Sequence, residues 1–522
     1  MKSAPLLALL ATASALAAEP EAPTSTRPAW TIAGTATGYA PLIDHPFLGD
    51  TRLEMPLSLA VRADDVAAYP IDRNGTAQAA GVVVNPRLRL GLRFTGAKAW
   101  APWGVQAEYE HDLPTGALGS RGADGVGMPG TEPVTTQLRK LNVKVNYGST
   151  LLVGAGVMTS HWGLGLVAND GAHDWEPGSA RFVDPRGGDR VLRGFVATGP
   201  HTSLGLVAMV GVDRVLDDDS LLVQEEIAAG KGGPGDTANQ LVGAVSIGQP
   251  GTTWAGLYVA YRGQTTADGR GLKVTVIDAS VMAHREVFTR AKLSLGAEAA
   301  FIAGESSLAP TPDYPSQRVS QLGVAARAGL DLGGYGAALD GLFASGDRNL
   351  DDGSQNAFRA DPNYELGLLL FRQVLAAQTG RAPVVAGDPL LVGAPAPGLD
   401  RFPTRGAATN TFAVFPRAFV RPVDGVEVYG GVLVAWAQVP PVDPFNTRVA
   451  GGTLRDALDG APGNFLGTEL DLGARGRFLV FGTELTLGLE AGYFLPGDAF
   501  RDAAGKPMAP VVGGRAMLSF RL

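Results

Sequence analysis

The stretch NPRLRLGLRF, residues 85–94, alternates between basic and apolar side chains along most of its length. Successive side chains of a β-strand point to opposite faces, so an extended chain here would have one apolar face and one positive face. The apolar face would carry Leu88, Leu90, Leu92 and Phe94, and the other face Arg87, Arg89 and Arg93. A helix would scatter the arginines around its circumference, so the pattern predicts a strand with two unlike faces.

The same alternation recurs as far as the C-terminus. It is found in residues 139–147, 289–301, 467–478, 482–494 and 513–522. In the last of these, GGRAMLSFRL, one face would carry Leu518, Phe520 and Leu522, and the other Arg515, Ser519 and Arg521. We therefore expect one repeating plan of strands from about residue 82 to the end of the chain.

Composition narrows the classes of protein that fit. The chain has 71 glycines and 36 prolines, which disfavour long helices, and only 18% of its residues are charged. No run of about 18 apolar residues follows the N-terminal region, so no transmembrane helix is predicted there. The chain has no cysteine, which excludes disulfides and thiolate chemistry. If the protein spans a membrane, it must do so as a closed barrel, because only helices and closed barrels pair every backbone group within a bilayer.

The connections between the predicted strands alternate between short and long. Short turns rich in Gly, Pro, Asn or Asp are expected at 147–150, 198–201, 248–251, 332–335 and 422–425. Long polar segments are expected at 114–134, 167–190, 217–238, 305–317, 348–407, 440–464 and 497–508. Short turns on one rim and long loops on the other are typical of outer-membrane barrels, whose short-turn rim faces the periplasm.

The strand count follows from this pattern. About seventeen strands can be counted after residue 82, and bacterial barrels of this kind take an even number. One more strand must therefore come earlier, either from residues 30–40 or from residues 51–63. The prediction is an all-β protein, a transmembrane antiparallel up-and-down β-barrel of about 18 strands, with 16 as the alternative. At that size the interior is wide enough to leave an aqueous channel.

The N-terminus has the features of a secretory signal peptide. Lys2 supplies a positive charge, residues 6–17 are apolar, and Ala15, Leu16 and Ala17 form a small-x-small cleavage site. We therefore expect a signal peptide at 1–17 and a mature barrel at 18–522, with 18–50 forming a periplasmic or plug-like N-terminal segment. The predicted location is the outer membrane of a Gram-negative cell.

Two stretches resemble known families. The C-terminal strand is similar to the signal by which Gram-negative outer-membrane barrels are recognised for assembly, although it ends in Leu522 where Phe is commonest. Residues 158–171, MTSHWGLGLVANDG, followed by 188–200, GDRVLRGFVATGP, resemble an uncharacterised family of porin-like outer-membrane barrels from myxobacteria-like bacteria. That resemblance covers about forty residues and implies a fold and a location, without a substrate.

The stretch SHWGLGLVANDG, residues 160–171, also suggests two local sites. Trp162 is predicted at the membrane interface, where the polar edge of an indole can face lipid headgroups. Asp170, Asp174 and Glu176 lie in an acidic loop whose oxygens could hold Ca²⁺ or a cation that bridges lipopolysaccharide. The alternative is a solvated loop whose Asn, Asp and Gly residues make turns. No other cofactor is expected.

The polar faces of the predicted strands point to the lumen. The candidate pore-lining residues are Arg87, Arg89, Arg93, Lys140, Lys144, Lys292, Arg327, Arg417, Arg421, Arg475, Arg477, Arg515, Arg521, Glu469, Asp471, Glu484 and Glu490. Rings of charged side chains select ions in such pores. The alternative is that these residues form cross-strand ion pairs that hydrate and stiffen the wall.

The segment 348–407 is far longer than an ordinary connection. Its centre, residues 364–382, places apolar residues at helical spacing and would need a surface to cover. We predict a lid or constriction that folds inward and brings Arg372 and Arg381 towards the permeation path. The alternatives are an extracellular loop that lies against the outer leaflet or contacts a neighbouring molecule.

Function is predicted from these features together. No catalytic motif is present, and the adjacent Ser160 and His161 would point to opposite faces of a strand, so we expect no enzyme. The leading prediction is a porin-like channel for small polar or anionic solutes, or a polysaccharide-export pore. The alternative is a plugged structural or adhesion barrel. The expected partners are membrane lipid, lipopolysaccharide, the barrel-assembly machinery and small solutes, with no nucleic acid.

Overall fold

A computed structural model describes most of the chain. The described residues are 30–31, 43–48, 51–78, 81–96, 102–115, 135–171, 178, 188–218, 220–221, 235–249, 253–288, 291–349, 352–386, 398, 401–480 and 482–522. The predicted signal peptide and most of residues 18–50 lie outside them.

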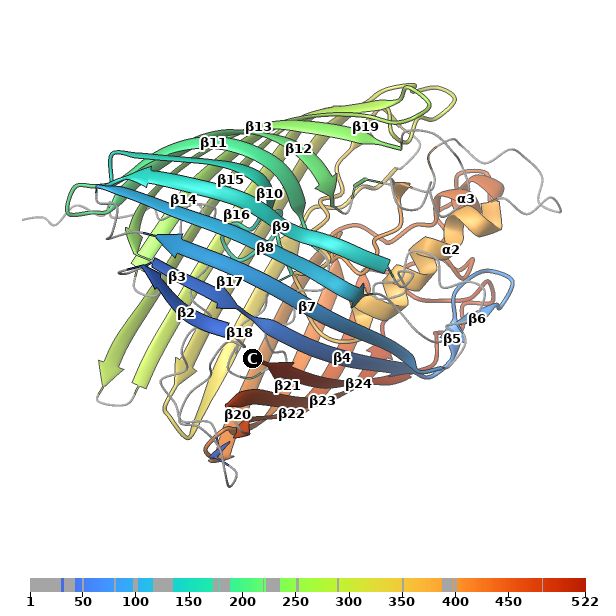
Figure 1. Cartoon of the computed structure of the whole chain (residues 1–522). Coiled ribbons are helices and arrows are strands. Elements are labelled where there is room, and N and C mark those ends of the chain that lie inside the picture. The colour runs from blue at the N-terminus through green and yellow to red at the C-terminus, as the bar shows by residue number, and fades with distance from the viewer. Residues whose placement is uncertain are drawn as a thin grey trace, which may run out of the picture.

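Eighteen antiparallel strands close into a barrel, as the sequence predicts (Figure 1). In chain order these are β4 (Leu57–Val66), β7 (Val83–Gly96), β8 (Trp103–Thr115), β9 (Thr135–Tyr147), β10 (Leu151–Thr159), β11 (Arg190–His201), β12 (Leu206–Asp217), β13 (Thr237–Gln249), β14 (Thr253–Thr265), β15 (Gly271–Phe288), β16 (Ala291–Ser306), β17 (Gln317–Asp331), β18 (Tyr335–Ala344), β20 (Thr411–Val423), β21 (Val426–Ala437), β22 (Phe465–Val480), β23 (Thr483–Pro496) and β24 (Val511–Arg521). The barrel closes where β24 pairs with β4, with Leu518 opposite Val61.

Of the two candidates for the first strand, the structure selects residues 51–63. β3 (Thr51–Met55) and β4 both pair with β7 and are separated only by Pro56, which has no backbone N–H to donate. β2 (Ile43–Leu48) pairs with the other edge of β3. Within 30–40, only β1 (Trp30–Thr31) is described, and it runs parallel to β22 instead of joining the wall between β24 and β7.

The two rims of the barrel differ as expected. Short connections such as 148–150, 332–334 and 424–425 lie on one rim, together with the start of β3 and the end of β24. The long connections, including 160–189 and 345–410, lie on the other. Figure 1 shows the helices at the long-loop end, opposite β2 and β3. We call these ends the short-turn rim and the long-loop rim.

One predicted turn is misplaced by a few residues. The sequence suggested a turn at 198–201, but β11 continues to His201 and the turn is formed by 202–205. A register shift between Thr198 and His201 lets the strand accommodate the Gly-Pro step without ending there.

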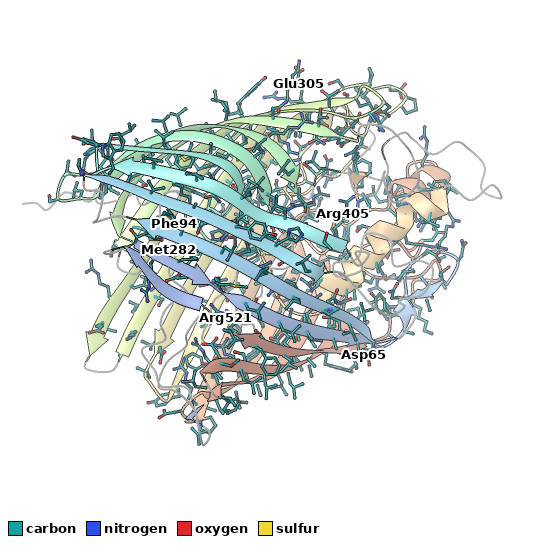
Figure 2. The ribbon with its side chains drawn as sticks, in the orientation of Figure 1. Asp65, Phe94, Met282, Glu305, Arg405 and Arg521 are labelled. Atoms are coloured by element: carbon teal, nitrogen blue, oxygen red, sulfur yellow. The ribbon has the colours of Figure 1, made fainter. Side chains whose placement is uncertain are left out.

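The two faces of each strand carry different residues. On β23, Leu487 and Leu489 are 44% and 64% exposed, whereas Thr486 and Glu490 on either side of them are buried. β24 repeats the arrangement, with Arg515 and Ser519 buried and Phe520 exposed. The exposed face is an apolar band that meets lipid, so the barrel is of the outer-membrane type. Figure 2 places Asp65 and Glu305 towards the long-loop end, and Phe94, Met282 and Arg521 nearer the other.

The helices lie inside the long connections. The segment between β18 and β20 contains β19 (Ser354–Gln355), the π-helix η2 (Leu370–Leu375) and α2 (Ala376–Ala386). The segment between β21 and β22 contains α3 (Pro444–Val449), and the segment between β4 and β7 contains the small hairpin of β5 (Tyr69–Pro70) and β6 (Ala77–Gln78). Among the described residues, no helix is long and apolar enough to cross a bilayer.

Candidate functional site: the inner wall and the segments folded against it

A first cluster of predicted pore-lining residues lies on β7, β8 and β9. Arg89 Nε donates to Asp112 Oδ1 at 2.5 Å, and Lys144 Nζ donates to Glu108 Oε2 at 3.2 Å. Neighbouring positions on the same wall hold Arg87, Arg93 and Lys140. These bases therefore lie beside acids of the neighbouring strand, because antiparallel pairing brings inward side chains face to face.

A second cluster connects β17, β18, β20, β21 and β22. Asp340 on β18 accepts hydrogen bonds from Arg327, at 2.6 Å, and from Arg417. Glu427 on β21 also accepts hydrogen bonds from two arginines. Its Oε2 accepts from Arg421 Nε at 2.9 Å, and its Oε1 accepts from Arg475 Nη2 at 2.9 Å. Each of these acids thus bridges arginines from two different strands.

A third cluster lies on β22, β23 and β24. Glu484 accepts from Arg477 and lies 3.5 Å from Arg521. Arg515 Nε donates to Glu490 Oε2 at 2.7 Å. The Nη1 atom of Arg515 also donates to Glu365 Oε2 at 2.9 Å. Since Glu365 belongs to the connection between β18 and β20, Arg515 joins the barrel wall to that segment.

Lys292 differs from the other candidates. It lies next to the short-turn rim on β16 and is exposed, whereas most of the others are buried in ion pairs. The structure thus brings most of the candidates together as a network of paired charges on the inner wall, which is the arrangement named above as the alternative. Whether solutes touch this network remains a prediction.

The segment 364–377 folds against the inner wall and is held there by one glutamate. The carboxylate of Glu469, on β22, accepts the backbone N–H groups of Leu368, Leu369 and Leu370, the last two at 2.8 Å. Gly367 precedes these donors with φ of +72°, a conformation that glycine adopts without strain. Asp471 lies two residues along β22 from Glu469 and is also buried. We call residues 364–377 the long anchored segment.

The two arginines predicted in this constriction are both paired. Arg372 Nη1 donates to Glu365 Oε1 at 2.7 Å, and burial lowers the pKa of Arg372 to about 10. Arg381 Nε donates to Asp72 Oδ2 at 2.8 Å, in the connection between β4 and β7. Burial alone would raise the pKa of Asp72, but hydrogen bonds from Arg381 and Thr76 lower it below its usual value. Arg372 therefore ties its own segment together, whereas Arg381 joins that segment to the connection between β4 and β7.

A second segment, residues 160–171, folds inward in the same way. The carboxylate of Glu298, on β16, accepts the backbone N–H groups of Leu164 and Leu166, the latter at 3.0 Å. Gly163 precedes these donors with φ of +57°. We call residues 160–171 the short anchored segment. It touches the long connection directly, since Asp361 N donates to Leu166 O at 2.8 Å.

The prediction that Trp162 anchors the membrane interface is wrong. Trp162 is only 2% exposed and packs against Trp254 and Tyr258, with ring centroids 6.1 Å and 5.5 Å away. These partners face inward on β14, and Gly256 between them leaves room for the indole, since a Cβ there would lie 2.2 Å from Trp162 Cζ2. Trp162 therefore lies inside the barrel and packs against its wall, because Glu298 holds its segment there.

Residues at the outer edges of the strands are better placed to contact the interface. Trp103 is half exposed and meets Tyr147 at a ring-centroid distance of 4.9 Å, beside the short-turn rim. Trp436 is partly exposed and lies 5.7 Å from Phe465 beside the long-loop rim. Such aromatic pairs at both edges of the apolar band are typical of outer-membrane barrels.

The proposed cation site is only partly described. Asp174 and Glu176 lie outside the described residues. Asp170 Oδ1 lies 3.6 Å from His161 Nδ1, and its backbone carbonyl accepts a hydrogen bond from Arg139. Within the described part of the chain, no group of three His, Cys, Asp or Glu residues is arranged to hold a metal. Calcium at this loop therefore remains a prediction.

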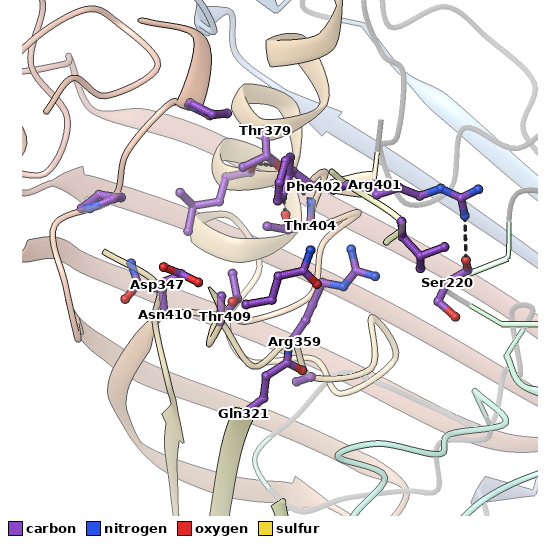
Figure 3. A pocket seen from close by; sticks show the side chains of 18 of the residues that line it. Ser220, Gln321, Asp347, Arg359, Thr379, Arg401, Phe402, Thr404, Thr409 and Asn410 are labelled. Carbon is purple, nitrogen blue, oxygen red and sulfur yellow. Dashed lines mark hydrogen bonds between the residues drawn. The ribbon is translucent and has the colours of Figure 1, made fainter. Parts of the chain in front are cut away.

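A cavity of about 430 Å³ lies between the two anchored segments and the inner wall of β14 to β17. Figure 3 shows Ser220 and Arg401 at one end, Asp347 and Asn410 at the other, and Arg359 between them, with Thr379 on α2 and Thr404 beside it. Val274, Val276, Ile302 and Val319 line its barrel side.

Sequence reasoning missed several inward charges. Arg193 and Asp213 form a bidentate pair with both distances at 2.7 Å, and Arg62 lies 2.7 Å from Asp64. The alternation of β11 and β12 could have placed Arg193 and Asp213 on the inner face. The sequence feature that could have predicted the anchoring role of Glu298 and Glu469 is weaker. Each meets a Gly-Leu-x-Leu stretch, residues 163–166 and 367–370, in a segment that is distant in sequence.

No family model and no curated protein sequence matches the chain. Among solved structures, it is similar to Pseudomonas aeruginosa OccK5 (OpdH), with 11% identity, 90% of this chain and 98% of that chain covered, and a TM-score of 0.48. It is also similar to P. aeruginosa OpdL, with 9% identity, 91% and 99% coverage and a TM-score of 0.48. Acinetobacter baumannii OccAB1 has 10% identity, 90% and 96% coverage and a TM-score of 0.46.

Proposed function

We propose that this protein is a porin-like outer-membrane channel through which small polar or anionic solutes diffuse. The observation that carries the proposal is the charged inner wall of a closed 18-strand barrel. A barrel of this size is too wide for wall side chains alone to fill. Charged side chains on the wall keep the remaining space hydrated.

The width of the path is set by the segments that fold inward. Glu469 and Glu298 hold the two anchored segments against the wall, and Arg515 adds a link through Glu365. Solutes would pass beside these segments. Because arginines and acids alternate along the wall, the local field differs from place to place, and it would orient solutes that carry both charges.

A second function is favoured by one observation. The long anchored segment forms an apolar core with the wall, in which Leu369, Leu370 and Phe494 are almost fully buried. A core of this kind inside a barrel could also close it. In that case the protein would act through its long loops as a structural or adhesion barrel of the cell surface. Polysaccharide export remains a further prediction.

Conductance of the purified protein in a planar bilayer tests the proposal. Folding would be checked first by heat-modifiable migration on a gel. We expect stepwise ion currents, and swelling of liposomes that contain the protein when they are placed in solutions of small sugars or organic acids. A folded protein with neither conductance nor swelling would contradict the channel and favour the plugged barrel.

The same proposal implies a location in the outer membrane and an interaction with the barrel-assembly machinery. β24 ends in alternating apolar residues with Phe520 near its end, which fits recognition by the barrel-assembly machinery. The exposed band of leucine and valine side chains would contact lipid, and the long-loop rim would contact lipopolysaccharide. Phe520→Ser should slow assembly in cells, whereas Ser519→Ala, on the inner face, should not.

A further inference from the structure

The cavity beside α2 has an apolar wall where a water-filled barrel is normally polar. Leu272, Val274 and Val276 on β15, Ile302 on β16 and Val319 on β17 all line it from the barrel side. Inward positions of wide barrels usually carry polar side chains, because they face water. Val274 and Val276 are almost fully buried, but Ile302 is only partly buried and borders the cavity. This wall is suited to the hydrocarbon part of a solute.

The charged residues around the cavity are unequal in number. Six aspartates line it, Asp189, Asp218, Asp347, Asp361, Asp443 and Asp456, against the three arginines Arg262, Arg359 and Arg401. Asp347, Asp443 and Asp456 accept backbone N–H groups of the connecting segments, so they shape those segments. The remaining acids gather where the short anchored segment approaches β14.

Two of the arginines are already occupied by acids. Arg262 donates to Asp218 and, at 2.6 Å, to Ser220 Oγ. Arg401 Nη1 donates to Asp236 Oδ2 at 2.6 Å. The side chain of Asp236 is fully buried, and its other oxygen has no hydrogen-bond partner among the described residues. Arg262 and Arg401 are thus committed to Asp218 and Asp236, and the lining as a whole carries more aspartates than arginines.

Asp189 is the acid with the fewest partners. Its carboxylate accepts one long hydrogen bond, from Asn169 N at 3.4 Å, and Arg262, whose charge also acts on it, is already bonded to Asp218. Burial, together with the nearby Asp361 and Asp218, raises the pKa of Asp189 well above its usual value. Asp361 is held in place because its backbone N–H donates to Leu166 O. Asp189 is partly buried, and a carboxylate with acidic neighbours is stabilised by a cation.

We propose that this cavity binds a cationic amphipathic solute, with its hydrocarbon part against Val274, Val276 and Ile302 and its protonated amine beside Asp189 and Asp361. The proposal rests on the channel function, because it names a class of solute that would pause in the channel. The proposed site favours cations, whereas the rest of the wall is rich in arginine.

Three probes that share one cyclohexyl ring separate the effect of charge from that of the hydrocarbon. Cyclohexylammonium carries the hydrocarbon ring and the cation, cyclohexanecarboxylate reverses the charge, and cyclohexanol has no charge. Binding is measured by titration calorimetry on the detergent-solubilised protein, with empty micelles subtracted. Interruption of the single-channel current is measured separately. We expect saturable binding of cyclohexylammonium, at least tenfold weaker binding of cyclohexanol and none of the carboxylate.

Matched variants locate the site. Asp189→Asn keeps the shape but cannot become negative beside the bound amine, and it should weaken cyclohexylammonium binding at least tenfold. Ile302→Gln should weaken it severalfold by making the apolar wall polar. Asp268→Asn is the control, because Asp268 lies in the exposed turn between β14 and β15 and does not line the cavity. It should leave binding unchanged.

Each result has a defined meaning. Equal binding of the cation and the carboxylate, or an Asp189→Asn variant that binds like the parent, would overturn the site. Calorimetry does not require an open pore, so binding that persists in a protein without conductance would support the site while contradicting the channel. Conductance without saturable binding of cyclohexylammonium would support the channel and contradict the site.

Discussion

The two anchored segments are held by the same device but to different extents. In each, an inward glutamate accepts backbone N–H groups that follow a glycine of positive φ, Gly163 at Glu298 and Gly367 at Glu469. Glu469 accepts three such groups and Glu298 accepts two. A glutamate in a β-barrel wall can thus act as an acceptor for a loop as well as a lining charge.

The apolar surroundings of the two glutamates differ more than the hydrogen bonds that the glutamates accept. The long anchored segment contributes Leu366, Leu368, Leu369 and Leu370 to the largest apolar core of the described residues. The short anchored segment contributes Trp162 and Ala168 to a smaller core with Tyr258, and only Leu166 to the buried residues of the larger one. The difference suggests that the long segment sets the width of the channel and the short segment supports it.

Removing each segment would test this ranking most strongly. Deletion of residues 364–382 should raise single-channel conductance about twofold or more, because the wall behind it lines a wide barrel. Deletion of residues 162–167 should raise conductance less. The measurement is single-channel recording on variants whose gel migration shows a folded barrel. Equal conductance in the first variant and the parent protein would remove the constriction role of the long segment.

Neutralising each anchor compares the two glutamates directly. Glu469→Gln exchanges a carboxylate for an amide with one acceptor oxygen, which leaves buried N–H groups unpaired at about 1–3 kcal/mol each. We expect faster amide exchange across residues 364–375, and a smaller effect on residues 160–168 in Glu298→Gln. Hydrogen–deuterium exchange with mass spectrometry measures both. A larger effect in Glu298→Gln would reverse the ranking.

A pH titration examines loops that are tied by their own acids instead of by the wall. Burial raises the pKa of Asp443 and of Asp456 to about 6, and Asp456 accepts N–H groups from Leu458 and Arg501. The folded loops bind these protons more tightly than the unfolded ones do. The stabilisation that comes from binding these protons is therefore fully present below about pH 4 and is lost as the pH rises through 6, by about 3 kcal/mol for each acid.

Hydrogen–deuterium exchange of the backbone amides of residues 443–460, corrected for intrinsic rates, should accordingly be slower at pH 5 than at pH 7.5. Asp456→Asn should reduce this dependence. The segments held by Glu298 and Glu469 serve as the internal comparison in the same experiment. Exchange that is faster at pH 5 in the parent protein would show that the sign is wrong.

The smallest expected effects come from the glycines at the anchors. A Cβ at Gly163 would lie 2.3 Å from Glu298 Oε2, and one at Gly367 would lie 2.9 Å from Glu469 Oε1. Alanine at either position also meets a backbone of positive φ, which costs about 1 kcal/mol. Gly163→Ala and Gly367→Ala should therefore loosen their own segments modestly. Gly269→Ala, with positive φ but open space around it, isolates the backbone contribution.

The barrel itself was readable from local sequence. Side chains alternate with a period of two in any strand, so the pattern of residues 85–94 and 482–494 was enough to separate lipid-facing from inward residues. The alternation of short and long connections then placed the two rims, and the count of strands predicted closure. These features depend on neighbours within a few residues, which is why no other part of the chain was needed to predict them.

The partners of the inward residues were decided only by the tertiary structure. Arg515 meets Glu365, which is 150 residues away in the chain, and Glu469 meets Leu368, which is 101 residues away. Trp162 was misread for the same reason, since the strand-to-loop position suited an interface anchor while Glu298, far along the chain, drew it inside. The two-residue period of a strand indicates which face a side chain occupies. It does not state which distant loop will fold against that face, because loop placement depends on packing and hydrogen bonds formed only once the barrel has closed.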